Sequence, residues 1–196
     1  MTALQMHSQI RLLWKDLQPV MSDTQGAAMV PTTTLAACPA KLDVLFVPGG
    51  FGTAAAMRDA ELIRLKNAGA QASYVTSVCS GALILGAAGL LDGYRATTHW
   101  GAHEFLKDVG AVSVKARFVE DRNRLTGGGV TAGIDFGLAL LAKLRGRDAA
   151  ETAQLMMEYD PAPPFHAGSP DTAPPQIVEQ VRQILAQAAP SFQTVR

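Results

Sequence analysis

The chain has 196 residues, 48% hydrophobic and 17% charged, which suits one compact domain with a large core. Its 17 Lys and Arg residues balance its 17 Asp and Glu residues. The sequence therefore has no excess of positive charge that would indicate binding to nucleic acid or to an anionic membrane surface. No apolar run approaches the roughly 20 residues that span a bilayer, no signal peptide is evident, and the two cysteines lack disulfide spacing, so we expect a reduced cytoplasmic protein.

The first third of the chain predicts strands joined by loops and one helix. Residues 10–14 read as a short buried strand. Residues 26–38 are rich in small and β-branched residues and read as an exposed strand or hairpin, in which Pro31 argues against a central position. The near-continuous apolar strand 42–50 ends in Pro-Gly-Gly, and such strands are typical of parallel sheets covered on both faces. The pattern then predicts a helix over 54–70.

The middle of the chain continues the alternation of strands and helices. A strand over 73–79 passes directly into an apolar helix over 80–91. A short strand over 95–100 leads into a helix over 101–110. Two further short strands flank a turn at residues 121–123.

The last third predicts helices and one irregular segment. Helices are expected over 131–146, which ends at a glycine, and over 147–159. The proline-rich stretch 160–175 predicts a loop, and an apolar stripe predicts an amphipathic helix over 176–189 that docks on the body. Strands that alternate with helices predict an α/β sandwich with a mostly parallel sheet, and we interpret residues 1–196 as a single domain.

Cys79 stands where the strand over 73–79 turns into its helix. Sites in open α/β sheets form at the carboxyl ends of strands, and the N–H groups of a helix N-terminus favour a thiolate, the nucleophilic form of cysteine. Gly81 gives the turn room, so the segment is similar to a nucleophile elbow. The alternative is a buried structural cysteine, which is our interpretation of Cys38, because it precedes Pro39 in a loop-like stretch.

Two glycine-rich segments are candidates for the wall of a site. Gly49 and Gly50 end the strand next to the elbow, and their N–H groups would form an oxyanion cradle; alternatively they are a simple turn. Residues 126–133 either let a strand pack tightly or line a pocket. They do not match a dinucleotide fingerprint, and we expect no cofactor.

His99 follows the next strand and is a candidate base or ion-pair partner for Cys79. The alternative is a capping or packing role beside Trp100, which is itself a candidate substrate contact. Because no cluster of His, Cys and carboxylate residues has metal-ligand spacing, we expect no metal.

In this order, the segments VLFVPGG, YVTSVCSGALILGAAGLL, ATTHWGAHEFL and LTGGGVTAGIDFGL resemble the ThiJ/PfpI superfamily, and within it the isonitrile hydratases. The proline-rich loop resembles theirs too, so the resemblance runs from about Ile10 to Pro175. It implies a flavodoxin-like α/β sandwich and a homodimer with sites near the subunit interface. It implies Cys79 as the nucleophile, and the residues implied around it are the Ser80 hydroxyl, the cradle of Gly49 and Gly50, and the turn Gly129-Val130.

The sequence departs from that superfamily in one respect. In the relatives, an acidic residue at the end of the first strand contacts the cysteine, and this sequence has no residue that matches it. Asp16 follows the second strand of the family and does not match this position. The first strand would be central, and without it the neighbouring strands, normally about 4.8 Å apart, are separated. We therefore expect about one further strand and helix upstream of Met1; alternatively residues 10–14 move into the vacant position, or a partner chain donates a strand.

The resemblance implies a lyase that hydrates an isonitrile, a small-molecule substrate, to an N-substituted formamide through a cysteine thioimidate. The missing acid predicts impaired activity, because a proton donor must assist this reaction. One alternative is a glyoxalase or an amidase or protease-like enzyme that uses Cys79 with His99. Another is a non-enzymatic module that senses a ligand or the oxidation of Cys79; the chain shows no appended DNA-binding segment, so we expect no nucleic-acid partner.

Overall fold

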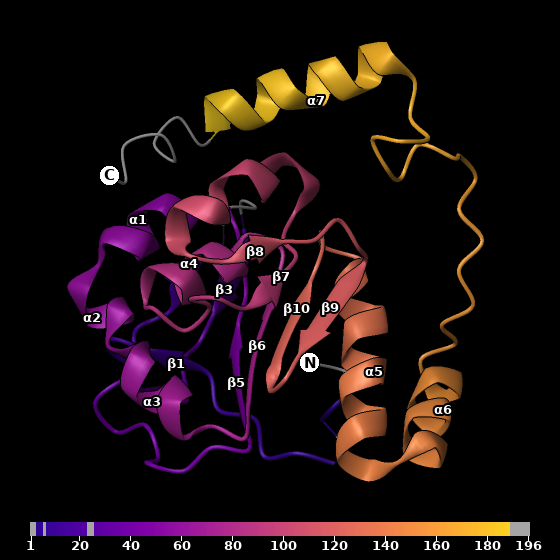
Figure 1. The fold of residues 1–196 in the computed structure, drawn as a ribbon. Helices are drawn as coiled ribbons and strands as arrows, with labels where there is room; N and C mark the ends of the chain where they lie inside the picture. Colours follow the sequence, from indigo (N-terminus) through magenta and orange to yellow (C-terminus); the bar gives the residue numbers. More distant parts are fainter. Residues whose placement is uncertain (1–2, 6, 23–25, 189–196) are drawn as a thin grey trace.

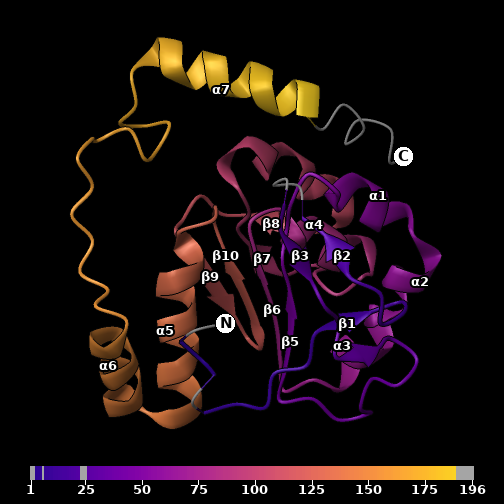
Figure 2. The ribbon, with the colours of Figure 1, turned by 180° about the vertical axis from the view of Figure 1, so that it is seen from behind.

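The computed structural model describes residues 3–5, 7–22 and 26–188 and shows an α/β sandwich with helices on both faces of a central sheet (Figures 1 and 2). The sheet has the strand order β5-β6-β10-β9. Strands β5, β6 and β10 are parallel, and β9 is antiparallel to β10. The mostly parallel sheet expected from the sequence is therefore confirmed. The four strands are β5 (Val44–Val47), β6 (Tyr74–Val78), β10 (Arg124–Gly127) and β9 (Phe118–Asp121).

Strand β6 lies between two hydrophobic clusters because its successive side chains point to opposite faces of the sheet. Val75 packs with Leu45 and the helix that follows β6 in one cluster. Val78 packs with Phe136 and neighbouring residues in the other cluster. Two covered faces account for the burial of every residue from Val75 to Val78.

The single helix expected over 54–70 is wrong, because the chain forms three short helices there. They are α1 (Thr53–Arg58), α2 (Ala60–Ile63) and α3 (Leu65–Gln71). The break falls at Asp59, which has an extended backbone and accepts hydrogen bonds from the N–H groups of Glu61 and Leu62. An aspartate that caps a new helix N-terminus in this way ends the preceding helix.

Helix α4 (Gly81–Ala87) follows β6 as expected, but it ends four residues before the expected end at Leu91. The segment expected to be an α-helix over 101–110 instead forms two 3₁₀ helices, η1 (Trp100–Phe105) and η2 (Lys107–Val109). The N–H of Gly110 bonds to the carbonyl of Lys107, an i→i+3 contact, and Gly110 has a φ of 80° that stops the helix.

Strand β7 (Arg95–Ala96) pairs in parallel with β8 (Val112–Ser113), outside the central sheet. The hairpin expected around residues 121–123 is confirmed by the antiparallel pairing of β9 with β10. Arg122 occupies the left-handed conformation (φ 55°) at its turn.

The N-terminal strands form two separate pairs. Strand β1 (Leu13–Trp14) is parallel to β4 (Thr33–Thr34), and β2 (Val20–Met21) is antiparallel to β3 (Ala28–Met29). The buried strand expected over 10–14 is therefore limited to Leu13 and Trp14, which are only half-buried. Ile10, where the expected strand begins, is 37% exposed.

Strand β5 borders an open edge of the central sheet. Within the described residues it pairs only with β6, and β1 does not join it. The alternative in which residues 10–14 move into the position of a first central strand is therefore wrong. Phe46, in the middle of β5, is 45% exposed beside this edge.

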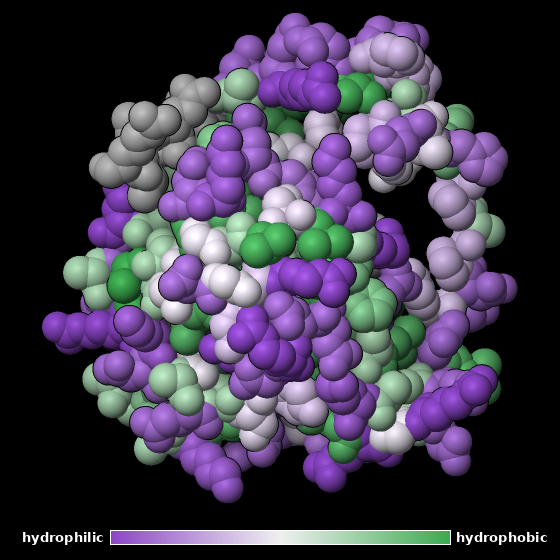
Figure 3. All heavy atoms as spheres, in the orientation of Figure 1, coloured by the Kyte–Doolittle hydropathy of each residue, from purple (hydrophilic) through white to green (hydrophobic). Residues whose placement is uncertain are grey.

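The C-terminal part contains helices α5 (Ala132–Arg145), α6 (Arg147–Met156) and α7 (Pro175–Ala188). Between α6 and α7, residues 160–174 run outside the body as an extended segment, here called the proline arm, and a space-filling view shows an opening between this arm and the body (Figures 1 and 3). Helix α7 meets the body near η1, where a Cβ added to Gly101 would lie 2.6 Å from a methyl group of Leu185. Across the described part of the chain, no helix combines the length and apolarity needed to cross a bilayer.

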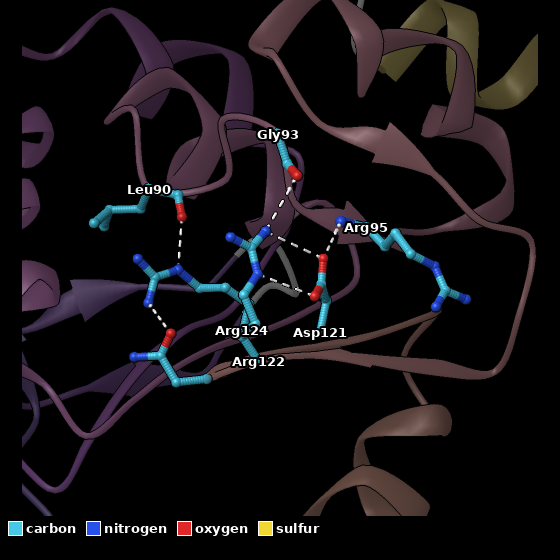
Figure 4. A network of polar contacts seen from close by, with 7 residues as sticks. Leu90, Gly93, Arg95, Asp121, Arg122 and Arg124 are labelled. Carbon is cyan, nitrogen blue, oxygen red and sulfur yellow. Dashed lines mark hydrogen bonds and ion pairs between the residues drawn. The ribbon is translucent and has the colours of Figure 1, made fainter.

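A network of two arginines fixes the turn between β9 and β10 (Figure 4). The guanidinium carbons of Arg122 and Arg124 lie 3.5 and 4.6 Å from the ring centroid of Tyr94. Arg124 is buried and donates from Nε to the carbonyl of Leu90 at 2.7 Å, while Arg122 pairs with Asp121. The network lies at the start of β10, whereas Cys79 lies beyond the far end of β6.

Candidate active site

Cys79 occupies the sharp turn between β6 and α4 and is half-buried. Its φ of 59° is left-handed, a conformation that non-glycine residues rarely adopt. Its N–H donates to the carbonyl oxygens of Gly128 at 2.7 Å and Gly127 at 3.1 Å. A strained cysteine at the carboxyl end of a central strand is the arrangement of a nucleophile elbow.

The turn Pro48-Gly49-Gly50 packs directly against the elbow, as the pairing of β5 with β6 requires. A Cβ added to Gly49 would lie 2.5 Å from the backbone nitrogen of Ser80. Because such contacts leave no space for any side chain, glycine is needed on this side of the interface. The sequence prediction that this turn lies next to the elbow is confirmed.

The Ser80 hydroxyl ties the two turns together. Its Oγ lies 2.7 Å from Oγ1 of Thr53 and accepts the N–H of Gly50 at 3.2 Å. Ser80 is only 7% exposed, so its hydroxyl serves the contact between the elbow and the β5 turn. The role implied by the resemblance, a hydroxyl next to the sulfur, stays a prediction.

The residues after β7 approach the elbow from another side. Thr98 donates from Oγ1 to the carbonyl of Cys79 at 2.9 Å, a contact that sequence reasoning missed because a lone threonine carries no distinctive signal. The next residue, His99, accepts the N–H of Gly101 on Nδ1 at 3.2 Å. This bond assigns the ring proton of neutral His99 to Nε2, and burial lowers the pKa of the imidazole.

His99 also borders the glycine loop before α5. A Cβ added to Gly129 would lie 3.0 Å from Cδ2 of the His99 ring. The neighbouring Val130 is 80% exposed. The structure therefore brings Gly129 to His99, but it is Gly128, singled out only as part of a glycine run, whose carbonyl contacts Cys79.

Trp100 lies beside the C-terminal helix. Its ring centroid is 5.7 Å from that of His99. It lines a cavity of about 70 Å³ together with the end of the proline arm and α7, including Ile177, Val178 and Val181. The sequence predicts the amphipathic pattern of α7 but not its position beside Trp100.

A second cavity of about 270 Å³ lies between residues 35–40 and helices α2 and α3, and Cys38 lines it. Burial raises the pKa of the Cys38 thiol, which favours the uncharged, unreactive form. Within residues 3–5, 7–22 and 26–188, no three metal-ligating side chains gather into a cluster.

A mostly parallel sheet covered by helices, with a strained cysteine between a central strand and the following helix, defines an α/β protein with a cysteine at its nucleophile elbow. The family model that matches residues 6–143 is the DJ-1/PfpI family, and the chain belongs to this family.

Three relatives illustrate the likeness. An isonitrile hydratase of Pseudomonas putida is 54% identical over 94% of this chain and 79% of its own. The crystal structure of a ThiJ/PfpI family protein from Pseudomonas syringae superposes with a TM-score of 0.90 at 53% identity, over 94% of this chain and 76% of that one. The transcriptional regulator GbdR of Pseudomonas aeruginosa is 30% identical over 70% of this chain but only 38% of its own length.

Proposed function

We propose that the protein is an isonitrile hydratase that converts an isonitrile and water into an N-substituted formamide, with Cys79 as the nucleophile. The observation that carries the proposal is the left-handed, half-buried Cys79 at the elbow. The 54% identity to the isonitrile hydratase of P. putida supports this choice of reaction. The regulator GbdR matches over only 38% of its own length, and no contact among the described residues of the site favours a regulatory function.

The proposed reaction consumes no thiolate, because Cys79 is regenerated at the end of each cycle. The sulfur of Cys79 bonds to the isonitrile carbon, and a proton reaches the same carbon to give a thioimidate. Water then adds to this carbon, the C–S bond breaks, and a proton reaches nitrogen, which releases the formamide and restores the thiolate. The sum is one isonitrile and one water to one formamide.

The surrounding groups have different parts in this scheme. Gly49 packs against the elbow and would form a wall of the site with Gly50, and Gly129 and Val130 would flank the site from the loop before α5. Since Nδ1 of His99 already accepts a hydrogen bond, the neutral ring would act as a donor through Nε2 rather than as a base. Trp100 would contact the organic substituent of the isonitrile.

In the part of the chain that the structure describes, the site lacks the carboxylic acid that the relatives are expected to place against the cysteine as a proton donor. Among the described residues, no carboxylate makes a hydrogen bond to Cys79. We therefore expect slow turnover by this chain.

The test uses the two cysteines as a matched pair, since both are half-buried. Formamide production from an aryl isonitrile is measured for the unaltered chain, for Cys79→Ser and for Cys38→Ser. The proposal expects Cys79→Ser to lose the activity and Cys38→Ser to keep it. Equal rates in both variants would exclude Cys79 as the nucleophile.

We also propose that two copies of the chain associate. The hairpin of β2 and β3 exposes Met21, Met29 and Val30 by 66, 52 and 58%, and an isolated two-stranded hairpin is marginally stable in water. Light scattering on the purified protein should give twice the mass of the chain. Replacement of Met21 and Met29 by Lys should return it to the single-chain mass.

A further inference from the structure

The conformation of Cys79 depends on a chain of contacts that leads away from the site. Its N–H bonds to the carbonyl of Gly128 at 2.7 Å, and the N–H of Gly128 bonds in turn to the carbonyl of Arg117 at 2.9 Å. A Cβ on Gly128 would lie 3.3 Å from that same oxygen. The backbone of Arg117 therefore fixes the loop that holds the amide of Cys79.

The side chain of Arg117 is fixed by Asp135, in the first turn of α5. Nε of Arg117 pairs with Oδ2 of Asp135, and this carboxylate raises the pKa of the guanidinium. The pair joins the segment before β9 to the helix that begins beside the glycine loop. A single surface pair contributes little to stability, so its importance lies in what else the carboxylate holds.

The second oxygen of Asp135 binds the root of the proline arm. The Tyr159 hydroxyl donates to Oδ1 at 2.8 Å. Tyr159 is further held by α6, because its N–H donates to the carbonyl of Gln154 at 3.1 Å and its own carbonyl accepts Nε2 of Gln154 at 3.2 Å. Glu158, just before it, is left-handed with a φ of 49° and redirects the chain. One carboxylate thus links the arm to the support of the elbow.

We propose that Asp135 is a positioning residue for Cys79, and that Tyr159 docks the root of the proline arm on the same carboxylate to hold the glycine loop in place. The catalytic consequence rests on the proposed function, because it takes Cys79 as the nucleophile. Removal of either contact loosens the Gly128 carbonyl, and the N–H of Cys79 loses its partner more often. Substrate binding is expected to change less than the chemical step, because the contact that is loosened holds the amide of Cys79.

The amide of Cys79 can be observed directly. Because the chain has two cysteines, isotope labelling of cysteine nitrogen gives two amide signals, which Cys38→Ser assigns. The rate of hydrogen exchange at Cys79 relative to that at Cys38 is then compared among variants. Tyr159→Phe and Asp135→Asn should raise this ratio about three- to tenfold, the effect of losing one hydrogen bond. Arg117→Lys should stay closer to the unaltered protein than Arg117→Gln.

The control breaks a matched ion pair between α5 and the adjoining strand β9. Lys143 of α5 pairs with Glu120 of β9 at 2.7 Å, toward the other end of α5, and Glu120→Gln should leave the ratio unchanged. Where isonitrile turnover is measurable, Tyr159→Phe should lower kcat by a larger factor than it changes KM. An exchange ratio that is the same in Tyr159→Phe as in Glu120→Gln overturns this inference whatever the turnover, while the loss of the proposed function would show only in the turnover.

Discussion

Gly81 packs so closely against Val47 that a Cβ added to it would lie 2.1 Å from the Val47 carbonyl oxygen. The contact joins the first residue of α4 to the last residue of β5. A backbone oxygen in a paired strand cannot rotate aside as the end of a flexible side chain can. The elbow and the β5 turn therefore share one rigid interface.

Gly81→Ala should lower the free energy of unfolding by about 3 kcal/mol or more, because the clash forces backbone movement. Urea denaturation measures this change. Gly52→Ala is the control, since Gly52 has a φ of −74° and nothing within 4 Å of the added Cβ. If both variants unfold at the same urea concentration, the contact is looser than described.

Cys79 should be destabilising in its own position. The left-handed region costs an L-residue with a Cβ about 1–2 kcal/mol, whereas glycine adopts it freely. Cys79→Gly should thus be more stable than Cys79→Ala by about 1 kcal/mol, although both lack the thiol. Urea midpoints of the two variants give the comparison; a less stable glycine variant would show that the strain is absent.

Stability should fall in mild acid because of two histidines. Burial lowers the pKa values of His99 and His103, with Lys115 adding to the effect on His103. Above about pH 6.5, the unfolded value, both states are neutral; as the pH falls from there to the folded pKa, the unfolded state binds more protons and the free energy of unfolding falls. His99→Gln and His103→Gln should flatten this slope in urea titrations between pH 7 and 5, and an unchanged slope in both variants would contradict this account.

Arg124 should contribute to stability through its buried contacts with Leu90 and Tyr94. Arg124→Met keeps much of the side-chain volume but leaves the Leu90 carbonyl without its donor, so the free energy of unfolding should fall by about 1–3 kcal/mol. Arg147→Met is the comparison, because Arg147 is 85% exposed in its pair with Glu151 and should matter by less than about 0.5 kcal/mol. Thermal or urea unfolding of the two variants distinguishes the cases.

The elbow could be predicted because its determinants are local. A strand with two buried faces, a cysteine and a following glycine stand within ten residues of sequence, and parallel pairing brings the preceding Pro-Gly-Gly turn beside them. Helix α5 and the hairpin of β9 and β10 have equally local patterns. In these segments periodicity and turn residues agree with the final packing.

Other features could not be predicted from the periodicity of the sequence. The helix breaks at Asp59 because the side chain of this residue caps a new helix instead of continuing the first. The segment of η1 and η2 forms i→i+3 hydrogen bonds and stops at Gly110. Neither the contact of Tyr159 with Asp135, 24 residues apart, nor the stacking of Arg122 and Arg124 on Tyr94 leaves a periodic trace. Polar residues that meet in this way look like ordinary surface residues in a linear sequence.

The open edge of β5 has a practical consequence for work with this protein. Val44–Val47 is short, uncharged and rich in β-branched and aromatic residues, and within the described residues one of its sides has no strand partner. Unprotected edges of this kind template pairing between molecules. Concentrated solutions should aggregate and scatter light on warming below the temperature of global unfolding. Phe46→Lys should prevent this aggregation.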